Sequence, residues 1–440
     1  MKQVFKKAGL WVFILTLLCL FASGVRHVAT GGTRLGFITN PLVVFSEFPG
    51  IVYDVLTSKE INGVCPTYVS KDTSFREVNC LEYDVFGLNS FFNDVEHRWD
   101  IKLFNFRNDS VYFSWHLEKE SYIQLGERQF RNSRLKNPVL LKDRSLVAVS
   151  VESNNLYRLD RESNILWHNT SKNFHHSLNL SVDGNIWACS SAERGFRLGS
   201  EKQKKSIRDD FVTKIDVETG EILYDKSVCD ILIENGFKNF VYGFSNDGKP
   251  SMENDPIHLN DIQPVYESGP FWEKGDLFLS LRHKSLVIHY RPQTGEIKRL
   301  LQGPFLNQHD VDVISDHEIA LFNNNSTNIG LNIVDSGDES EGFASAADDL
   351  LLSGIIIYNF LDSTYHPYLD ELFASEKIFS QTEGSYEFLS SGDICLESEN
   401  DAKIYFMNRD GILLKKQFET PVENYVHLPN WIRIFENINF

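Results

Sequence analysis

Short apolar runs alternate with turn residues from about residue 100 to the C-terminus. Leu146–Ser150, Ile319–Phe322 and Ile404–Met407 have the length of strands, and similar runs are often followed by Thr-Gly or Asp-Gly turns. We identify no convincing amphipathic helix in this region, because apolar residues do not recur at helical spacing. The pattern predicts an all-β region built from hairpins.

The strands form one repeated unit: a strand, a hairpin, a second strand ending in Asp, a glycine turn and a third strand. Units of about 40 residues with four strands each are typical of β-propellers. Five copies are clear, and a weaker one lies near residues 100–135. We therefore expect an all-β, six-bladed β-propeller over residues 100–440.

Histidines recur within this repeat. His176 and His309 are each followed by Asp at the seventh position and by Ile at the tenth. A third copy opens with His258 and has a longer turn before its next strand. The innermost strands of a propeller line its channel, so we expect the three imidazoles to meet at one mouth. Three imidazoles at one point suggest either a metal site or a nucleophile with proton-transfer partners.

The N-terminus carries a targeting segment. Lys2, Lys6 and Lys7 precede a mostly apolar run, Ala8–Val25, which is just long enough to span a bilayer. Residues 1–26 are interpreted as a transmembrane signal anchor or a cleaved signal helix. The lysines should stay cytoplasmic, so the protein is expected to be exported, with its body on the periplasmic side of the membrane. Residues 27–99 are expected to form a lead-in or stalk.

Charge and cysteine content narrow the possible partners. The formal net charge is −18, which argues against a nucleic-acid partner because phosphate binding needs a clustered basic surface. Cys65 and Cys80 could pair in an oxidising compartment or remain thiols. Asp261, Asp310 and Asp312 are interpreted as turn or solvent residues. The sequence does not indicate an oligomeric state.

The stretches around the histidines resemble the bacterial arylsulfate sulfotransferases. The resemblance covers residues 140–330 well, and the last repeat only by its general pattern. The segments that carry it are Phe174-His-His176 with Asp183-Gly-Asn185, the His258 segment, Leu279-Ser-Leu-Arg282-His283, and Asn307-Gln-His309-Asp310 leading to Leu321-Phe-Asn323.

This resemblance implies a six-bladed propeller that moves a sulfuryl group from an aryl sulfate to a phenol, without a nucleotide donor or other cofactor. His309 would be the nucleophile that becomes sulfated, and Arg282 would bind the sulfuryl oxygens. His176 and His258 would orient the sulfate and transfer protons. His175 should face away if its segment is extended, and His283 is expected to be structural.

Other interpretations remain open. The three histidines could be retained for packing, or they could form a zinc site. Arg282 and the lack of a carboxylate at ligand spacing favour a site without metal. The alternative to an enzyme is a non-catalytic extracytoplasmic propeller that acts as a binding module, and a channel filled by aromatic side chains would support it.

Overall fold

The computed structural model describes residue 16 and residues 20–23, 68–96, 98–117, 134–150, 153–197, 204–243, 255–326, 352–429 and 431–438. The chain divides into two compact units, Met1–Pro66 and Thr67–Phe440. All strands in the described residues belong to the second unit.

The described residues form six antiparallel sheets of four or five strands and one three-stranded sheet. The first sheet contains β28 (Arg433–Phe435), β3 (Phe86–Asn93), β4 (Arg98–Asn105) and β5 (Val111–His116). The second contains β6 (Leu135–Leu140), β7 (Leu146–Ser150), β8 (Leu156–Leu159) and β9 (Ile165–Asn169). The third contains β10 (Asn173–Leu180), β11 (Ile186–Arg197), β12 (Lys204–Ile215) and β13 (Ile222–Ser227).

The other three large sheets repeat this order. The fourth contains β14 (Leu259–Pro264), β15 (Leu277–Leu281), β16 (Leu286–Arg291) and β17 (Glu296–Leu301). The fifth contains β18 (His309–Val313), β19 (Glu318–Asn323), β20 (Gly354–Asn359) and β21 (Thr364–Tyr368). The sixth contains β22 (Ser385–Phe388), β23 (Ile394–Ser398), β24 (Lys403–Asn408), β25 (Gly411–Lys416) and β2 (Val78–Asn79).

The remaining elements are short. The three-stranded sheet contains β1 (Tyr68–Ser70), β27 (Tyr425–His427) and β26 (Phe418–Glu419). Helical elements described in the second unit are α4 (Val228–Glu234), α5 (Lys238–Tyr242), α7 (Asp370–Glu376) and the 3₁₀ turn η3 (Arg282–Lys284).

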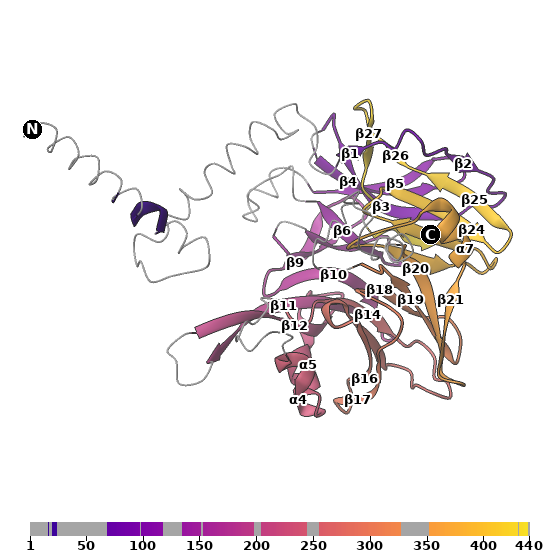
Figure 1. The fold of residues 1–440 in the computed structure, drawn as a ribbon. Coiled ribbons are helices and arrows are strands. Elements are labelled where there is room, and N and C mark those ends of the chain that lie inside the picture. The colour runs from indigo at the N-terminus through magenta and orange to yellow at the C-terminus, as the bar shows by residue number, and fades with distance from the viewer. Residues whose placement is uncertain are drawn as a thin grey trace, which may run out of the picture. The chain divides into compact units, whose positions relative to one another are not determined.

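One edge strand of each large sheet faces its neighbours. The edge strands β6, β10, β14, β18 and β22 contact one another in chain order, and β28 contacts β6. Early and late strands therefore lie side by side, as the purple and yellow strands of Figure 1 show. This is a propeller-like arrangement.

Buried apolar clusters lie between neighbouring sheets. Six clusters each join residues of two sheets, and one of them lies between the first and last sheets, where Phe104 and Phe106 pack against Ile404 and Phe406. Since a sheet buries one face by packing on another layer, each sheet depends on both of its neighbours.

The prediction of an all-β, propeller-like fold is confirmed. Leu146–Ser150 is β7 at the predicted bounds, and the other two runs fall within β19 and β24. The predicted start of the β region at residue 100 is too late: β3 begins at Phe86, inside the expected lead-in, because it pairs with the C-terminal strand β28.

The N-terminal predictions fall mostly outside the described residues. Residues 16 and 20–23 of the apolar run are helical, and none of the helices described is both long and apolar enough to cross a bilayer. Cys80 is an exposed free thiol. Cys65 lies outside the described residues.

Candidate functional site

His176 and His309 occupy the same place in two edge strands. Each lies four residues before the end of its strand, β10 or β18. In β14 that place belongs to Asn260, and His258 lies two residues earlier, just before the strand. His176 and His258 both have left-handed backbone, with φ of 52° and 57°, which is uncommon for residues other than glycine. The third histidine therefore reaches the site from a different register position than the repeat suggests.

The structure brings these three histidines together. The ring centres of His176 and His258 are 4.9 Å apart, and those of His176 and His309 are 6.2 Å apart. Nε2 of His176 lies 3.0 Å from Nε2 of His258, so one nitrogen donates to the other. Nδ1 of His258 lies 2.6 Å from a carboxylate oxygen of Asp255. Asp255, His258 and His176 thus form a chain that can hold and pass a proton.

His309 is fully buried, and one hydrogen bond fixes its tautomer. Its Nδ1 lies 2.6 Å from Oδ1 of Asn324. The amide of Asn324 is oriented by Nδ2, which donates to the backbone carbonyl oxygens of Ser380 and Glu383. Because Oδ1 can only accept, Nδ1 of His309 carries the proton, and Nε2 keeps a free lone pair.

That Nε2 atom has no hydrogen-bond partner among the described residues. Burial, together with the nearby charge of Arg282, lowers the pKa of His309 to about 4, although the carboxylate of Glu383 opposes the shift. Burial also lowers the pKa of His176 well below its ordinary value. Both rings are therefore neutral near pH 7, and Nε2 of His309 is a buried nucleophile or ligand atom.

Arg282 follows β15 and begins the turn η3. Its side chain is buried, and its backbone N–H donates to the carbonyl oxygen of His258 at 3.0 Å. Nη1 lies 2.9 Å from Nε2 of His283, and Nε has no partner among the residues described. The guanidinium is therefore held beside the three histidines with donor capacity to spare.

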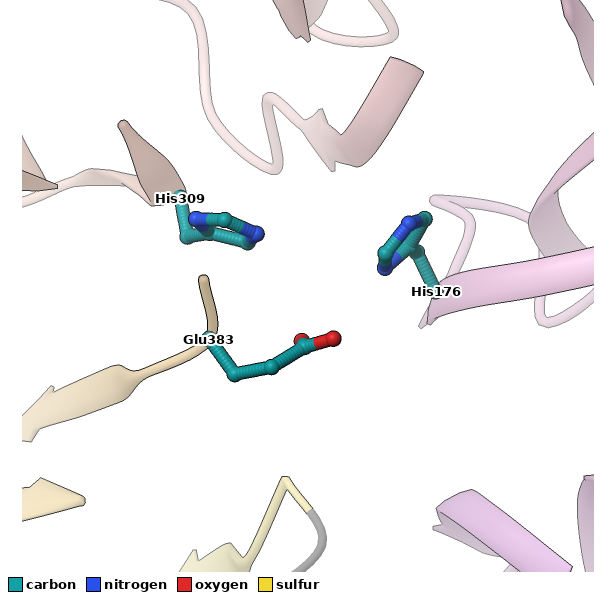
Figure 2. Close-up of side chains that lie close together, drawn as sticks. All are labelled: His176, His309 and Glu383. Carbon is teal, nitrogen blue, oxygen red and sulfur yellow. The ribbon is translucent and has the colours of Figure 1, made fainter. Parts of the chain in front are cut away.

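Glu383 is a site residue that the sequence analysis missed. Figure 2 shows its carboxylate pointing toward the rings of His176 and His309. One nitrogen from each ring and a carboxylate oxygen lie within 4.8 Å of one another. Although burial opposes ionisation, the positive charge of Lys136 lowers the pKa of Glu383, so a carboxylate stands beside the two rings.

The position of Gly384 in the repeat is a sequence signal that could have indicated Glu383. Gly384 lies four residues before the end of β22, the place that His176 and His309 take in their strands. Gly384 has a φ of +148°, and a Cβ there would lie 2.5 Å from the ring of Phe322. No side chain fits at this place, so the preceding residue reaches the site instead.

The two histidines expected outside the site lie within it. The rings of His175 and His176 are 5.1 Å apart, and Nε2 of His175 lies 3.2 Å from Asp210. The prediction that His175 faces away is wrong, because side chains alternate only along regular strand and the backbone at His176 is left-handed. The ring of His283 lies 4.3 Å from that of His258.

A pocket of about 420 Å³ opens beside His176. Lys136 and Arg208 give it positive charge, and Glu193 contributes one carboxylate. Its other walls are small or amide side chains with the two adjacent histidines. The full lining is Lys136, Val149, Asn154, Asn173, His175, His176, Ser191, Ala192, Glu193 and Arg208. A pocket of this size can hold an aromatic ring with a polar substituent.

Two groups of side chains in the described residues could hold a metal ion. One is His176, His309 and Glu383, and the other is Asp255, His258 and His283. The expectation that no carboxylate lies at ligand spacing is therefore wrong. Folding brings Glu383 to two histidines that are distant in the sequence, and it places Asp255 beside His258, three residues later in the chain.

Comparison with known families identifies the chain. Residues 137–419 match the family described as arylsulfotransferase (ASST). The chain belongs to the arylsulfotransferase family. The matched segment contains all four predicted site residues and Glu383, and it begins in β6 and ends in β26.

Other comparisons add less. No curated protein matches the chain. A Bacteroides caccae protein of unknown function is 10% identical, with a TM-score of 0.48 over 81% of this chain and 100% of that one. TolB from Acinetobacter baumannii is 10% identical, with a TM-score of 0.41 over 91% and 73%. Selenomethionine-substituted virginiamycin B lyase from Staphylococcus aureus is 11% identical, with a TM-score of 0.36 over 67% and 72%. None of these scores bears on activity.

Proposed function

We propose that this arylsulfotransferase moves a sulfuryl group from an aryl sulfate to a phenol through a sulfated His309, without a nucleotide. The observation that carries the proposal is the lone pair of His309 Nε2, which is buried, free of partners and aimed into the site. A neutral imidazole is a good nucleophile, and a covalent intermediate divides a difficult transfer into two displacements.

In the first displacement, Nε2 of His309 attacks sulfur and forms an N–S bond while the S–O bond to the aryl group breaks. The His176–His258 pair enters this step with one extra proton, which the carboxylate of Asp255 stabilises, and the leaving phenolate takes that proton. In the second displacement, an acceptor phenol gives its proton to the same pair. Its oxygen attacks sulfur, and the N–S bond breaks to restore His309.

Charges around the site match this sequence of steps. The planar fork of Arg282 suits the three oxygens of a transferring sulfuryl group. The sulfated imidazole keeps its proton on Nδ1, which donates a hydrogen bond to Oδ1 of Asn324, and the ring becomes positively charged. Glu383 favours positive charge on that ring, as its effect on the pKa of His309 indicates.

The pocket beside His176 supports a place for the aromatic ring of donor or acceptor. It opens directly on His176, and Lys136 and Arg208 attract the negative charge of a sulfate ester. The family assignment implies aryl sulfates and phenols as small-molecule substrates.

We also propose that the six large sheets are the blades of a six-bladed propeller. The contacts of the edge strands in chain order and the apolar cluster between the last and first sheets support this count. The lysines and apolar run at the N-terminus support a membrane anchor with the body outside the cytoplasm.

Trapping with a labelled aryl sulfate tests the mechanism. The protein is mixed with the donor in the absence of acceptor, and the label is mapped by mass spectrometry. We expect one label on His309 and a stoichiometric burst of phenol, with neither in His309→Ala. A label on a tyrosine or on His176, or transfer that survives His309→Ala, would refute the assignment. Failure of every aryl sulfate to release phenol would favour the non-catalytic binding module.

A further inference from the structure

The side chains of His176, His309 and Glu383, all of which the structure describes, converge in the site, and no hydrogen bond joins them to one another. Nε2 of His309 and Nδ1 of His176 are buried and have no partner in the described part of the chain. The carboxylate of Glu383 points between the two rings (Figure 2). One nitrogen of each ring and one carboxylate oxygen lie within 4.8 Å of one another.

We propose that His176, His309 and Glu383 form a site for a divalent transition-metal ion, Zn²⁺ above all, and that this ion inhibits sulfuryl transfer. The proposal about binding stands on the geometry alone. The proposal about inhibition rests on the proposed function, because the ion would take the lone pair of His309 that attacks sulfur.

The donor set suits zinc. Two imidazole nitrogens and one carboxylate oxygen are common zinc ligands, and a fourth position would remain for water or an anion. The hydrogen bond from Nδ1 of His309 to Asn324 is the kind of contact that orients a metal-binding histidine.

Distances and charge set the limits of the site. Ligand atoms on one tetrahedral zinc ion are about 3.3 Å apart, so the three side chains must close in by up to about 1.5 Å. Arg282 opposes a cation, but its Nη1 is directed at His283 and Glu383 supplies an opposite charge. We therefore expect moderate affinity rather than a permanently bound ion.

The second group of potential ligands is less suited. Nδ1 of His258 is engaged by the carboxylate of Asp255, and Nδ1 of His283 lies 2.7 Å from the backbone oxygen of Asp255. Nε2 of His283 faces Arg282, and Nε2 of His258 faces His176. An ion there would have to break contacts that already satisfy these atoms.

Calorimetric titration with Zn²⁺ tests the site. The protein is prepared without a histidine tag and with Cys80→Ser, which removes an exposed thiol that could bind zinc. Glu383→Gln removes one ligand and keeps the backbone carbonyl that Asn324 contacts. Glu399→Gln is the matched control, because Glu399 is also a buried acid, and burial and the nearby charge of Glu383 raise its pKa. Asp255→Asn tests the second group, and thermal unfolding verifies that each variant is folded.

We expect one ion per chain in the parent protein. Affinity should fall about 100-fold or more in Glu383→Gln and in His309→Ala, since loss of a ligand should cost at least as much as loss of its orienting partner. It should stay within about threefold of the parent in Glu399→Gln and Asp255→Asn. No binding up to about 1 mM Zn²⁺, or loss in Asp255→Asn with retention in Glu383→Gln, would overturn the proposal.

Inhibition is measured separately. Zn²⁺ should raise the KM for an aryl sulfate without lowering kcat, and EDTA should reverse the effect. Tight binding with the expected variant pattern but no change in rate would overturn the inhibitory role. Binding in a protein that transfers no sulfuryl group even with EDTA would leave the metal site standing and would reject the proposed function instead.

Discussion

His309 differs from His289 and His427 in the side chains around its unused nitrogen. His289 is also buried, but its Nε2 bonds to Asp276 at 2.8 Å and its ring stacks on Phe278. Burial lowers the pKa of His427 to about 3, yet its ring packs against Tyr68 as part of the core. A lowered pKa therefore reports burial in all three. Only the convergence of free polar groups around His309 points to chemistry.

The pKa of His309 predicts the acid side of the pH profile. The neutral ring is the nucleophile, and its fraction falls as the pH drops through a pKa of about 4 rather than through the ordinary value near 6.5. We expect kcat/KM for an aryl sulfate to be flat between pH 7 and about pH 5 and to fall below that. Rates of phenol release at each pH measure this, and return to pH 7 with full recovery of activity verifies that the protein stayed folded. A loss of rate centred near pH 6.5 would contradict the buried neutral ring.

Arg282→Lys tests the guanidinium fork. Lysine keeps the charge and the backbone contact to His258 but loses paired donors, so transition-state stabilisation should fall by about 2–4 kcal/mol, or roughly 30- to 1000-fold in kcat/KM. Labelled His309 should still form slowly. Arg161→Lys, at an exposed arginine of the turn between β8 and β9, is the control and should match the parent. An unchanged kcat/KM in Arg282→Lys would show that the fork does not contact the sulfuryl group.

Neighbouring edge strands are joined by a repeated hydrogen bond. The residue after each shared place, Ser177 in β10, Asp261 in β14 and Asp310 in β18, accepts from a backbone N–H of the next edge strand. The Ser177 hydroxyl accepts from Ile262 at 3.1 Å, the Asp261 carboxylate accepts from Val311 at 2.9 Å, and the Asp310 carboxylate accepts from Tyr386 at 2.7 Å. The interpretation of Asp261 and Asp310 as turn or solvent residues is therefore wrong, because these side chains bridge sheets.

Asp310 allows a test of this bridge. Burial raises the pKa of Asp310 well above its ordinary value, which favours the neutral acid, and asparagine keeps a similar shape and one acceptor oxygen. We expect Asp310→Asn to change the free energy of unfolding by less than about 1 kcal/mol. Asp310→Ala leaves the buried N–H of Tyr386 without a partner and should cost about 1–3 kcal/mol. Denaturant unfolding measures both, and equal effects of the two changes would contradict the bridge.

Closure between its two ends organises the second unit, Thr67–Phe440. β28, near the C-terminus, pairs with β3, and β2 adds to the sheet of β25. Glu397 of β23 accepts the backbone N–H groups of Trp431 and Ile432, which tie the segment before β28 to the last sheet. The ring of Trp431 lies 6.4 Å from that of His309. Closure therefore affects the stability of the body and the wall of the site together.

Truncation tests the closure. Removing residues 433–440 deletes β28 and exposes the edge of β3, so we expect the melting temperature to fall by more than about 5 °C. Sulfuryl transfer should fall with it. Removing residues 439–440 alone should change neither quantity. A truncated protein that melts like the parent would show that β28 does not hold the two ends together.

Strand pattern and site chemistry differ in how far they can be read from the chain. Alternating apolar runs and glycine turns are local, so the strands of the repeat and the histidines at its start were predictable. Glu383, Asn324 and Asp255 were not, because their roles depend on which loops meet at the site. The left-handed backbone at His176 and the ring of Phe322 against Gly384 determine which side chains enter the site. Contacts between residues far apart in the chain exist only once the sheets have packed, and they decide which nitrogen of His309 is free.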